Sequence, residues 1–178
     1  MIAAASASSA ALIAAASAFV GLQDVSGGLL PGSVGEVLRR QAGSRGSGCW
    51  DMALLYHWGY WSQFDYRADE SSWPLIPTTE PEALAEFARA RGVLGAKPCD
   101  GDVFLQYSPR RSEFVRGGVI AHVYIDHDRP HDATYFEAVV LEGNSNRSGE
   151  LGGPRVARLV RRLCPDLGDR FIRWTELR

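Results

Sequence analysis

Cys49 and His122 are the residues of this sequence best suited, by type and setting, to nucleophilic catalysis. Cys49 ends a glycine-rich loop and directly precedes a segment with a helical pattern. At a helix start, unpaired N–H groups and the helix dipole lower a thiol pKa, and the same groups can bind the oxyanion of a tetrahedral intermediate. Gly46 and Gly48 allow a substrate backbone to approach closely. A buried structural cysteine is the alternative interpretation of Cys49.

His122 lies within an apolar run that predicts a strand, and it needs a partner to act as a base. The next predicted strand ends with Glu142 and Asn144, which are two residues apart and share one face. If the two strands are neighbours, Glu142 or Asn144 accepts a hydrogen bond from one ring nitrogen and leaves the other for sulfur. A histidine satisfied within the core is the alternative.

Tryptophans surround the candidate nucleophile in the sequence. We expect Gly48, Trp50 and Trp73 to contact the substrate. For the aromatic residues that follow the nucleophile, Trp58, Tyr60, Trp61 and Trp73, a wall that stacks on sugar or peptide is the alternative to packing in the core. Trp58 and Trp61 recur at helical spacing, which favours packing in the core.

No cofactor or metal is predicted. His127 and His131 stand among three aspartates, but a solvated hairpin tip explains this pattern better than a metal site. The three cysteines form no Cys-x-x-Cys pair. Cys99 and Cys164 are expected either as two buried thiols or as a disulfide, and Cys49 remains free in both cases.

The order of the elements predicts an α+β fold with the N-terminal helices packed on a small antiparallel sheet. Helices are expected over residues 10–22, 34–41, 50–64 and 81–91. Strands are expected over residues 102–105, 119–126, 135–142, 155–161 and 171–174. The whole chain, residues 1–178, is expected to form one domain.

Composition narrows the choice of partners. The 178 residues are 46% hydrophobic and carry a formal net charge of −2, so a core can form and nothing favours nucleic acid or an anionic membrane. Residues 1–20 are rich in Ala and Ser, and the first basic residue is Arg39. These features predict a packed helix that is frayed over residues 1–9, with a weak export signal as the alternative, and no membrane-spanning helix. We expect a monomer.

Taken in order, these motifs resemble the CHAP amidohydrolase/peptidase domain of the NlpC-like group, which has a papain-like fold. The matching segments are residues 19–24, Cys49 at a helix start, residues 101–103 (Gly-Asp-Val), His122-Val123, residues 142–146 (Glu-Gly-Asn-Ser-Asn) and the strand over residues 156–162. The resemblance covers roughly residues 10–178, and its specificity lies in the order and spacing of the motifs.

The resemblance implies hydrolysis of amide bonds in peptidoglycan, with action at the cell wall. Cys49 would be the nucleophile, His122 the general base and then acid, Glu142 the residue that orients the imidazole, and Asn144 an accessory polar residue. The sequence departs from the family where Gly48 precedes the cysteine and Trp50-Asp51 follow it.

Two other functions remain open from the sequence. The negative charge of Asp51 would raise the thiol pKa, which favours a catalytically silent module that binds cell wall or builds a phage particle. The third hypothesis is a related cysteine hydrolase that acts on an amide outside the wall.

No Asp-rich calcium loop is present near the N-terminus, so the sequence does not predict the metal site that some members of the family have.

Overall fold

Helices come first in the chain and strands second, which confirms the predicted α+β class. The computed structural model describes residues 2–23, 34–43, 50–64, 76–124, 135–145 and 155–176. The helices are α1 (Ile2–Ser17), α2 (Val34–Gln41), α3 (Trp50–Phe64) and α4 (Pro81–Ala90). The strands are β1 (Leu94–Gly95), β2 (Val103–Ser108), β3 (Glu113–Tyr124), β4 (Phe136–Ser145), β5 (Arg155–Leu163) and β6 (Arg170–Ile172).

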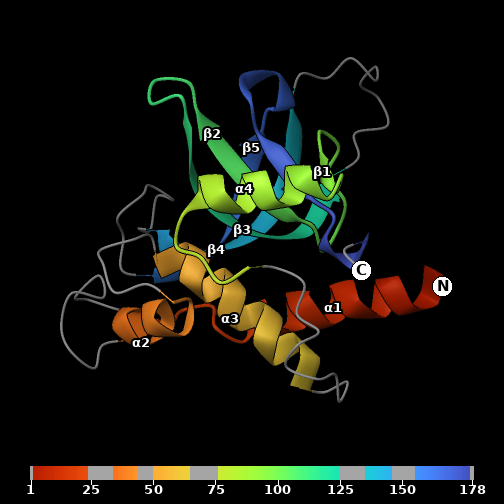
Figure 1. Ribbon diagram of the computed structural model, residues 1–178. Coiled ribbons are helices and arrows are strands. Elements are labelled where there is room, and N and C mark those ends of the chain that lie inside the picture. Colours follow the sequence, from red (N-terminus) through yellow and green to blue (C-terminus); the bar gives the residue numbers. More distant parts are fainter. Residues whose placement is uncertain are drawn as a thin grey trace.

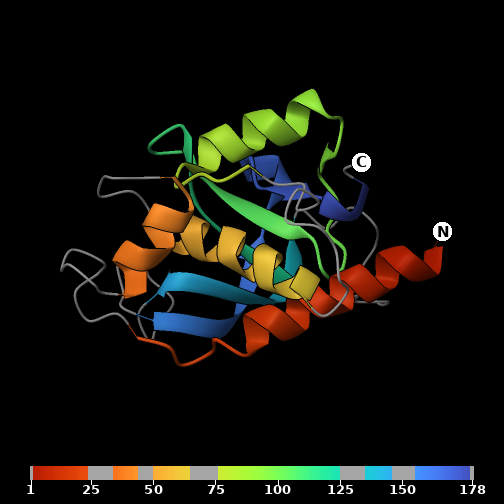
Figure 2. The same cartoon turned by 60° about the horizontal axis from the view of Figure 1, so that its bottom comes forward.

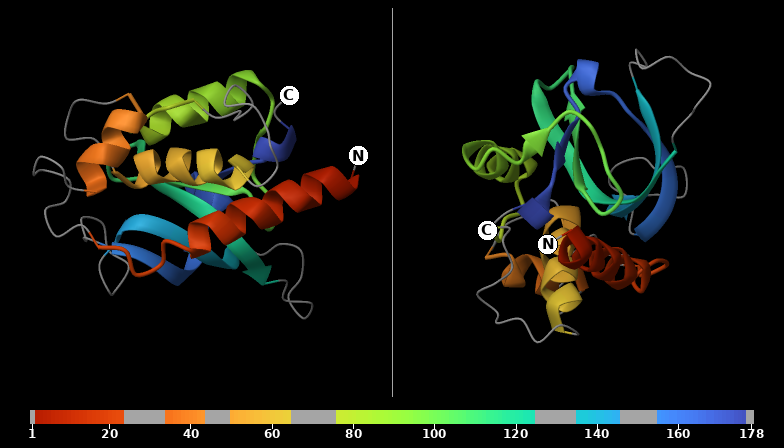
Figure 3. Two further views of the ribbon diagram at one scale, coloured as in Figure 1. Left: turned by 90° about the horizontal axis from the view of Figure 1, so that it is seen from below. Right: turned by 90° about the vertical axis from the view of Figure 1, so that its right-hand side faces the viewer.

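The six strands form one antiparallel sheet in the order β1-β6-β2-β3-β4-β5. The sheet is strongly curved, and the helices lie on one side of it (Figures 1 and 3). Its two faces therefore carry two separate cores. The larger core joins the sheet to the helices, and the smaller one fills the concave side. The smaller core consists of Phe104, Ile120, Ala138, Val140, Leu163 and Phe171.

Helix α3 is central to the larger core. It runs between α1 and α4 and crosses the sheet (Figure 2). The first six residues of α3, Trp50 to Leu55, are almost completely buried, and so is Trp58, as expected of a helix with apolar neighbours on every side. The prediction that Trp58 packs in the core is confirmed.

Two glycines allow the first turn of α3 to approach the sheet closely. A Cβ atom on Gly143 in β4 would come within 3.1 Å of the Trp50 ring, and one on Gly117 in β3 would lie 3.0 Å from the sulfur of Met52. Real Cβ atoms are seldom so close to their neighbours, so any larger residue at either position would push α3 outward. The start of α3 is therefore fixed at the level of Gly117 and Gly143.

A β-bulge at Ala121 interrupts the pairing of β3 with β4. Ile120 pairs with Val140 and His122 pairs with Val139, so β3 has one extra residue at this point. Val123 packs against the smaller core, and its neighbour His122 therefore points to the opposite, helix-covered face.

The segment that follows α1 closes one edge of the sheet. The N–H of Gly21 donates to the carbonyl of Val156 at 3.0 Å, and the N–H of Val156 donates to the carbonyl of Leu22 at 2.9 Å. Gln23 then forms an isolated bridge with Arg155. The backbone of β5 is thus partly paired on its outer side by residues from the other end of the chain.

Within the described ranges, no helix combines the length and the apolar character needed to span a lipid bilayer.

Candidate functional site

Three of the predicted site residues, Gly48, Cys49 and Trp73, lie outside the described residues. Trp50 is the first residue of α3 and is only 2% exposed. Its ring packs in the larger core, so the prediction that Trp50 contacts a substrate is wrong. Asn144 lies near the end of β4, as predicted for the strand that follows His122.

His122 has an exposed side chain that is oriented by a carboxylate. Its side chain is 56% exposed, and its Nδ1 atom lies 3.1 Å from Oδ2 of Asp100. The other carboxylate oxygen accepts the backbone N–H of Val123 at 2.7 Å, which fixes the plane of the Asp100 carboxylate. An ionised carboxylate only accepts hydrogen bonds, so Nδ1 is the donor to Asp100, and in the neutral ring Nε2 then carries the lone pair.

The pairing of β2 with β3 brings Asp100 to His122. Val103 pairs with Val119, and continuing this register by three residues places Asp100 opposite His122. The backbone of Gly101 donates to Ile120 at 2.8 Å and continues the pairing beyond the end of β2. Asp100 was not predicted as a site residue, although its place just before the Gly-Asp-Val strand opening could have indicated it.

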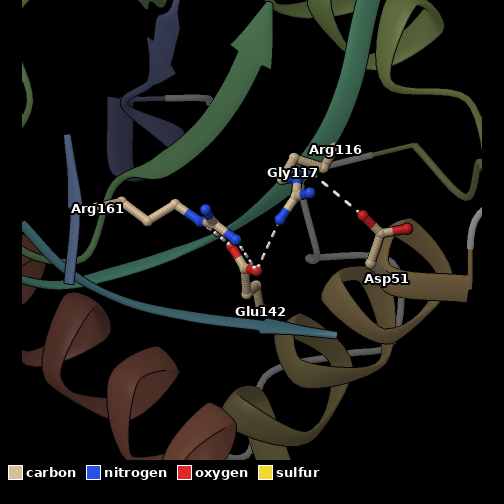
Figure 4. A network of polar contacts seen from close by, with 5 residues as sticks. All are labelled: Asp51, Arg116, Gly117, Glu142 and Arg161. Atoms are coloured by element: carbon tan, nitrogen blue, oxygen red, sulfur yellow. Dashed lines mark hydrogen bonds and ion pairs between the residues drawn. The ribbon is translucent and has the colours of Figure 1, made fainter. Parts of the chain in front are cut away.

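Glu142 does not orient His122, which corrects the prediction from the sequence. Its carboxylate is 1% exposed and forms ion pairs with Arg116, at 3.0 Å, and with Arg161, whose Nε lies 2.6 Å away (Figure 4). Glu142 is two residues after Val140 and shares its concave face, whereas His122 points to the helix-covered face. The strands are neighbours as expected, but the two side chains are on opposite sides of the sheet.

The start of α3 and His122 lie at different positions along strand β4. Trp50 is beside Gly143, whereas His122 pairs with Val139, which is four residues away along β4. Four residues of a strand span about 13 Å. The described residues thus form two separate polar groups, one around Asp51 and Glu142 and one around Asp100 and His122.

Asp51 is a buried acid in the first turn of α3. It is 1% exposed, and its Oδ2 accepts the backbone N–H of Gly117 at 3.4 Å. Oδ1 has no hydrogen-bond partner within the described part of the chain. Burial is the main cause that raises the pKa of Asp51 to about 7, and the charge of Glu142 raises it further while Gly117 and Arg116 oppose the shift.

We predict that Asp51→Asn stabilises the protein at alkaline pH. The unfolded acid ionises near pH 4 and the folded one near pH 7, so the unfolded chain binds fewer protons between these values. The free energy of unfolding of the wild type therefore falls as pH rises through this window, by at most about 4 kcal/mol. The amide that Asp51→Asn introduces cannot ionise, and we expect a gain of about 2 kcal/mol at pH 8 and little change at pH 4. Urea unfolding at both pH values measures this difference, and an equal effect at the two values would contradict it.

Cys99 is an exposed free thiol next to Asp100, and Cys164 is also free. An Nη2 atom of Arg173 lies 3.4 Å from the sulfur of Cys99. Because Cys99 is free, exposed and adjacent in sequence to the partner of His122, it is the control thiol for experiments on Cys49.

Among the described residues, no group of three or more His, Cys, Asp or Glu side chains is arranged to hold a metal ion. His127 and His131 lie outside these residues.

Comparison with known proteins gave no matching family model, no similar curated protein and no similar solved structure.

Proposed function

We propose that this chain is a cysteine-dependent hydrolase of amide bonds, with peptidoglycan as its substrate class and a papain-like arrangement of its site. Cys49 is the nucleophile, and His122 is the general base and then the general acid. The observation that carries the proposal is the exposed imidazole of His122, whose Nδ1 is held by Asp100 so that Nε2 can act as the base. The order of motifs along the chain supports the choice of nucleophile and substrate.

In the proposed reaction, Nε2 of His122 takes the proton of the Cys49 thiol, and the thiolate attacks the amide carbonyl. The resulting imidazolium gives this proton to the leaving amine as the C–N bond breaks and an acyl-enzyme forms. Water, activated by the same imidazole, then releases the acid and regenerates the thiol. Asp100 takes the orienting role that was predicted for Glu142.

A non-catalytic module that binds cell wall is the second candidate. It is favoured by the four-residue offset along β4 between the start of α3 and His122. Proton transfer requires the sulfur and Nε2 to come within about 3–4 Å in the complex with substrate. The hydrolase proposal therefore requires the sulfur of Cys49, which precedes α3, to reach Nε2 of His122 in the complex with substrate.

We predict that His122→Ala lowers the rate of amide hydrolysis by about 10²–10⁴-fold, because a positioned general base contributes about this much. Release of free amino groups from purified peptidoglycan is the measurement. Asp100→Asn should also lower the rate, because an amide can turn its N–H₂ toward Nδ1 and favour the wrong tautomer. Glu113→Gln is the matched control, because Glu113 is exposed and lies at the opposite end of β3 from His122. This change should leave the rate unchanged.

Two outcomes would overturn this proposal. Wild-type protein that binds peptidoglycan and releases no amino groups would favour the non-catalytic module. Equal hydrolysis by wild type and His122→Ala would remove His122 from the reaction.

A further inference from the structure

The first turn of α3, which directly follows Cys49, packs on the sheet through apolar side chains and adds one polar contact, made by a buried carboxyl group. Asp51 reaches across from the helix to the backbone N–H of Gly117 in β3 (Figure 4). The close approach of α3 to Gly143 and Gly117 leaves no room for a larger side chain between helix and sheet. Asp51 is thus enclosed between the first turn of α3 and the sheet.

The charges around Asp51 come from two strands. Arg116 in β3 favours the ionised carboxyl group, and Glu142 in β4 opposes it. Arg116 and Arg161 are in turn both paired with Glu142. With Asp51 ionised, these four side chains are electrically balanced, so the group is not a site for an external anion.

Other elements packed against α3 add few charges. Helix α1 contains no charged residue. Helix α2 carries a buried Arg39 and an ion pair at 2.6 Å between the half-buried Glu36 and the exposed Arg40. Two buried polar atoms of this group, Oδ1 of Asp51 and Nε of Arg116, make no hydrogen bond among the described residues. Of the two, only the Asp51 oxygen lies in the helix that follows Cys49.

We infer that Asp51 is a positioning residue for Cys49: its buried carboxyl group holds the first turn of α3 on Gly117 and controls the electrostatic environment of the thiol two residues earlier. This inference rests on the proposed function of Cys49 as nucleophile. A neutral Asp51 leaves the positive end of the helix dipole intact, whereas an ionised Asp51 opposes formation of a thiolate. The pKa of Asp51, about 7, places this change within the working range of a hydrolase.

Alkylation of Cys49 by iodoacetamide tests the inference without any substrate. The background is Cys99→Ser/Cys164→Ser, in which Cys49 is the sole remaining thiol. In this background the rate measured from pH 5 to 9 should show two ionisations, one near pH 7 from Asp51 and one from the thiol itself. Adding Asp51→Asn should remove the first and lower the thiol pKa by about one unit, which raises the rate at pH 7 by up to about tenfold.

Glu137→Gln is the control, because it neutralises an exposed acid far from α3 and should leave the profile unchanged. Identical profiles before and after the Asp51→Asn substitution would overturn the inference. If Asp51→Asn does not fold, the absence of a step near pH 7 in the parent protein would overturn it equally. If Asp51→Asn changes the alkylation profile but the wild type hydrolyses no amide, the role of Asp51 stands and the hydrolase proposal fails. Failure of the inference and failure of the proposed function therefore give different results.

Discussion

Cys49→Ala is expected to reduce amide hydrolysis by roughly 10⁴-fold or more, to the background level of the assay. Removal of the nucleophile eliminates the covalent route, and in enzymes of this type the remaining groups cannot replace it. The measurement is the release of amino groups from purified peptidoglycan, with thermal unfolding recorded in parallel to show that the variant folds.

Cys99→Ala is the matched control for this experiment. It removes an exposed thiol next to Asp100 and should keep wild-type activity. Full activity in Cys49→Ala would refute Cys49 as the nucleophile. If activity is instead lost in Cys99→Ala, the nucleophile is the thiol that lies 3.4 Å from Arg173.

Glu142→Gln is expected to lower the free energy of unfolding by about 3–5 kcal/mol. The change removes the carboxylate charge that faces two guanidinium groups on the concave face, and breaking a buried pair on one side is strongly destabilising. Urea unfolding at pH 7 measures the loss.

Glu137→Gln on the same strand is the control for stability. Its ion pair with Arg162 is exposed at 3.3 Å, so we expect a change below about 0.5 kcal/mol. The comparison also decides between two roles for Glu142. An unchanged free energy of unfolding together with a large fall in kcat would mean that Glu142 acts on the chemistry, contrary to its position in the structure.

The sequence predicted the helices around the candidate site accurately. The observed bounds of α2 and α3 agree with the predicted ranges, and α4 differs by one residue at its end. Each of these helices has a local signal: a Pro-Gly-Ser turn before α2, a glycine-rich loop before α3, and Gly92 after α4. The bounds of a helix can be predicted from the sequence when the residues that begin and end it lie next to it in the chain.

The strands were predicted less completely, because pairing with distant segments decides their lengths. Strand β3 begins at Glu113, six residues before the predicted start at Val119. The intervening residues include Arg116, Gly117 and Gly118, which have no alternating pattern and extend the strand only by pairing with β2. The two-residue strand β1 was not predicted for the same reason.

The candidate site shows where a sequence pattern reaches its limit. The prediction that the strands of His122 and Glu142 are neighbours is confirmed. Strict alternation would have placed both side chains on the face of Ile120 and Val140, but the extra residue at Ala121 turns His122 to the other face. No local pattern predicts this bulge. The hydrogen-bond partner of His122 is Asp100, in the turn before β2 on the other side of β3, and the alternation of residues could not identify it.

The pairing of residues 21–23 with β5 has a consequence for how the molecule forms. The hydrogen bonds between Gly21, Leu22 and Val156 join segments that are more than 130 residues apart in the sequence. A nascent chain has synthesised α1 long before β5 exists, so this end of the sheet can be completed only late in translation. Contacts between residues so far apart in the sequence slow folding. Until they form, the outer backbone of β5 offers unpaired N–H and C=O groups to other chains.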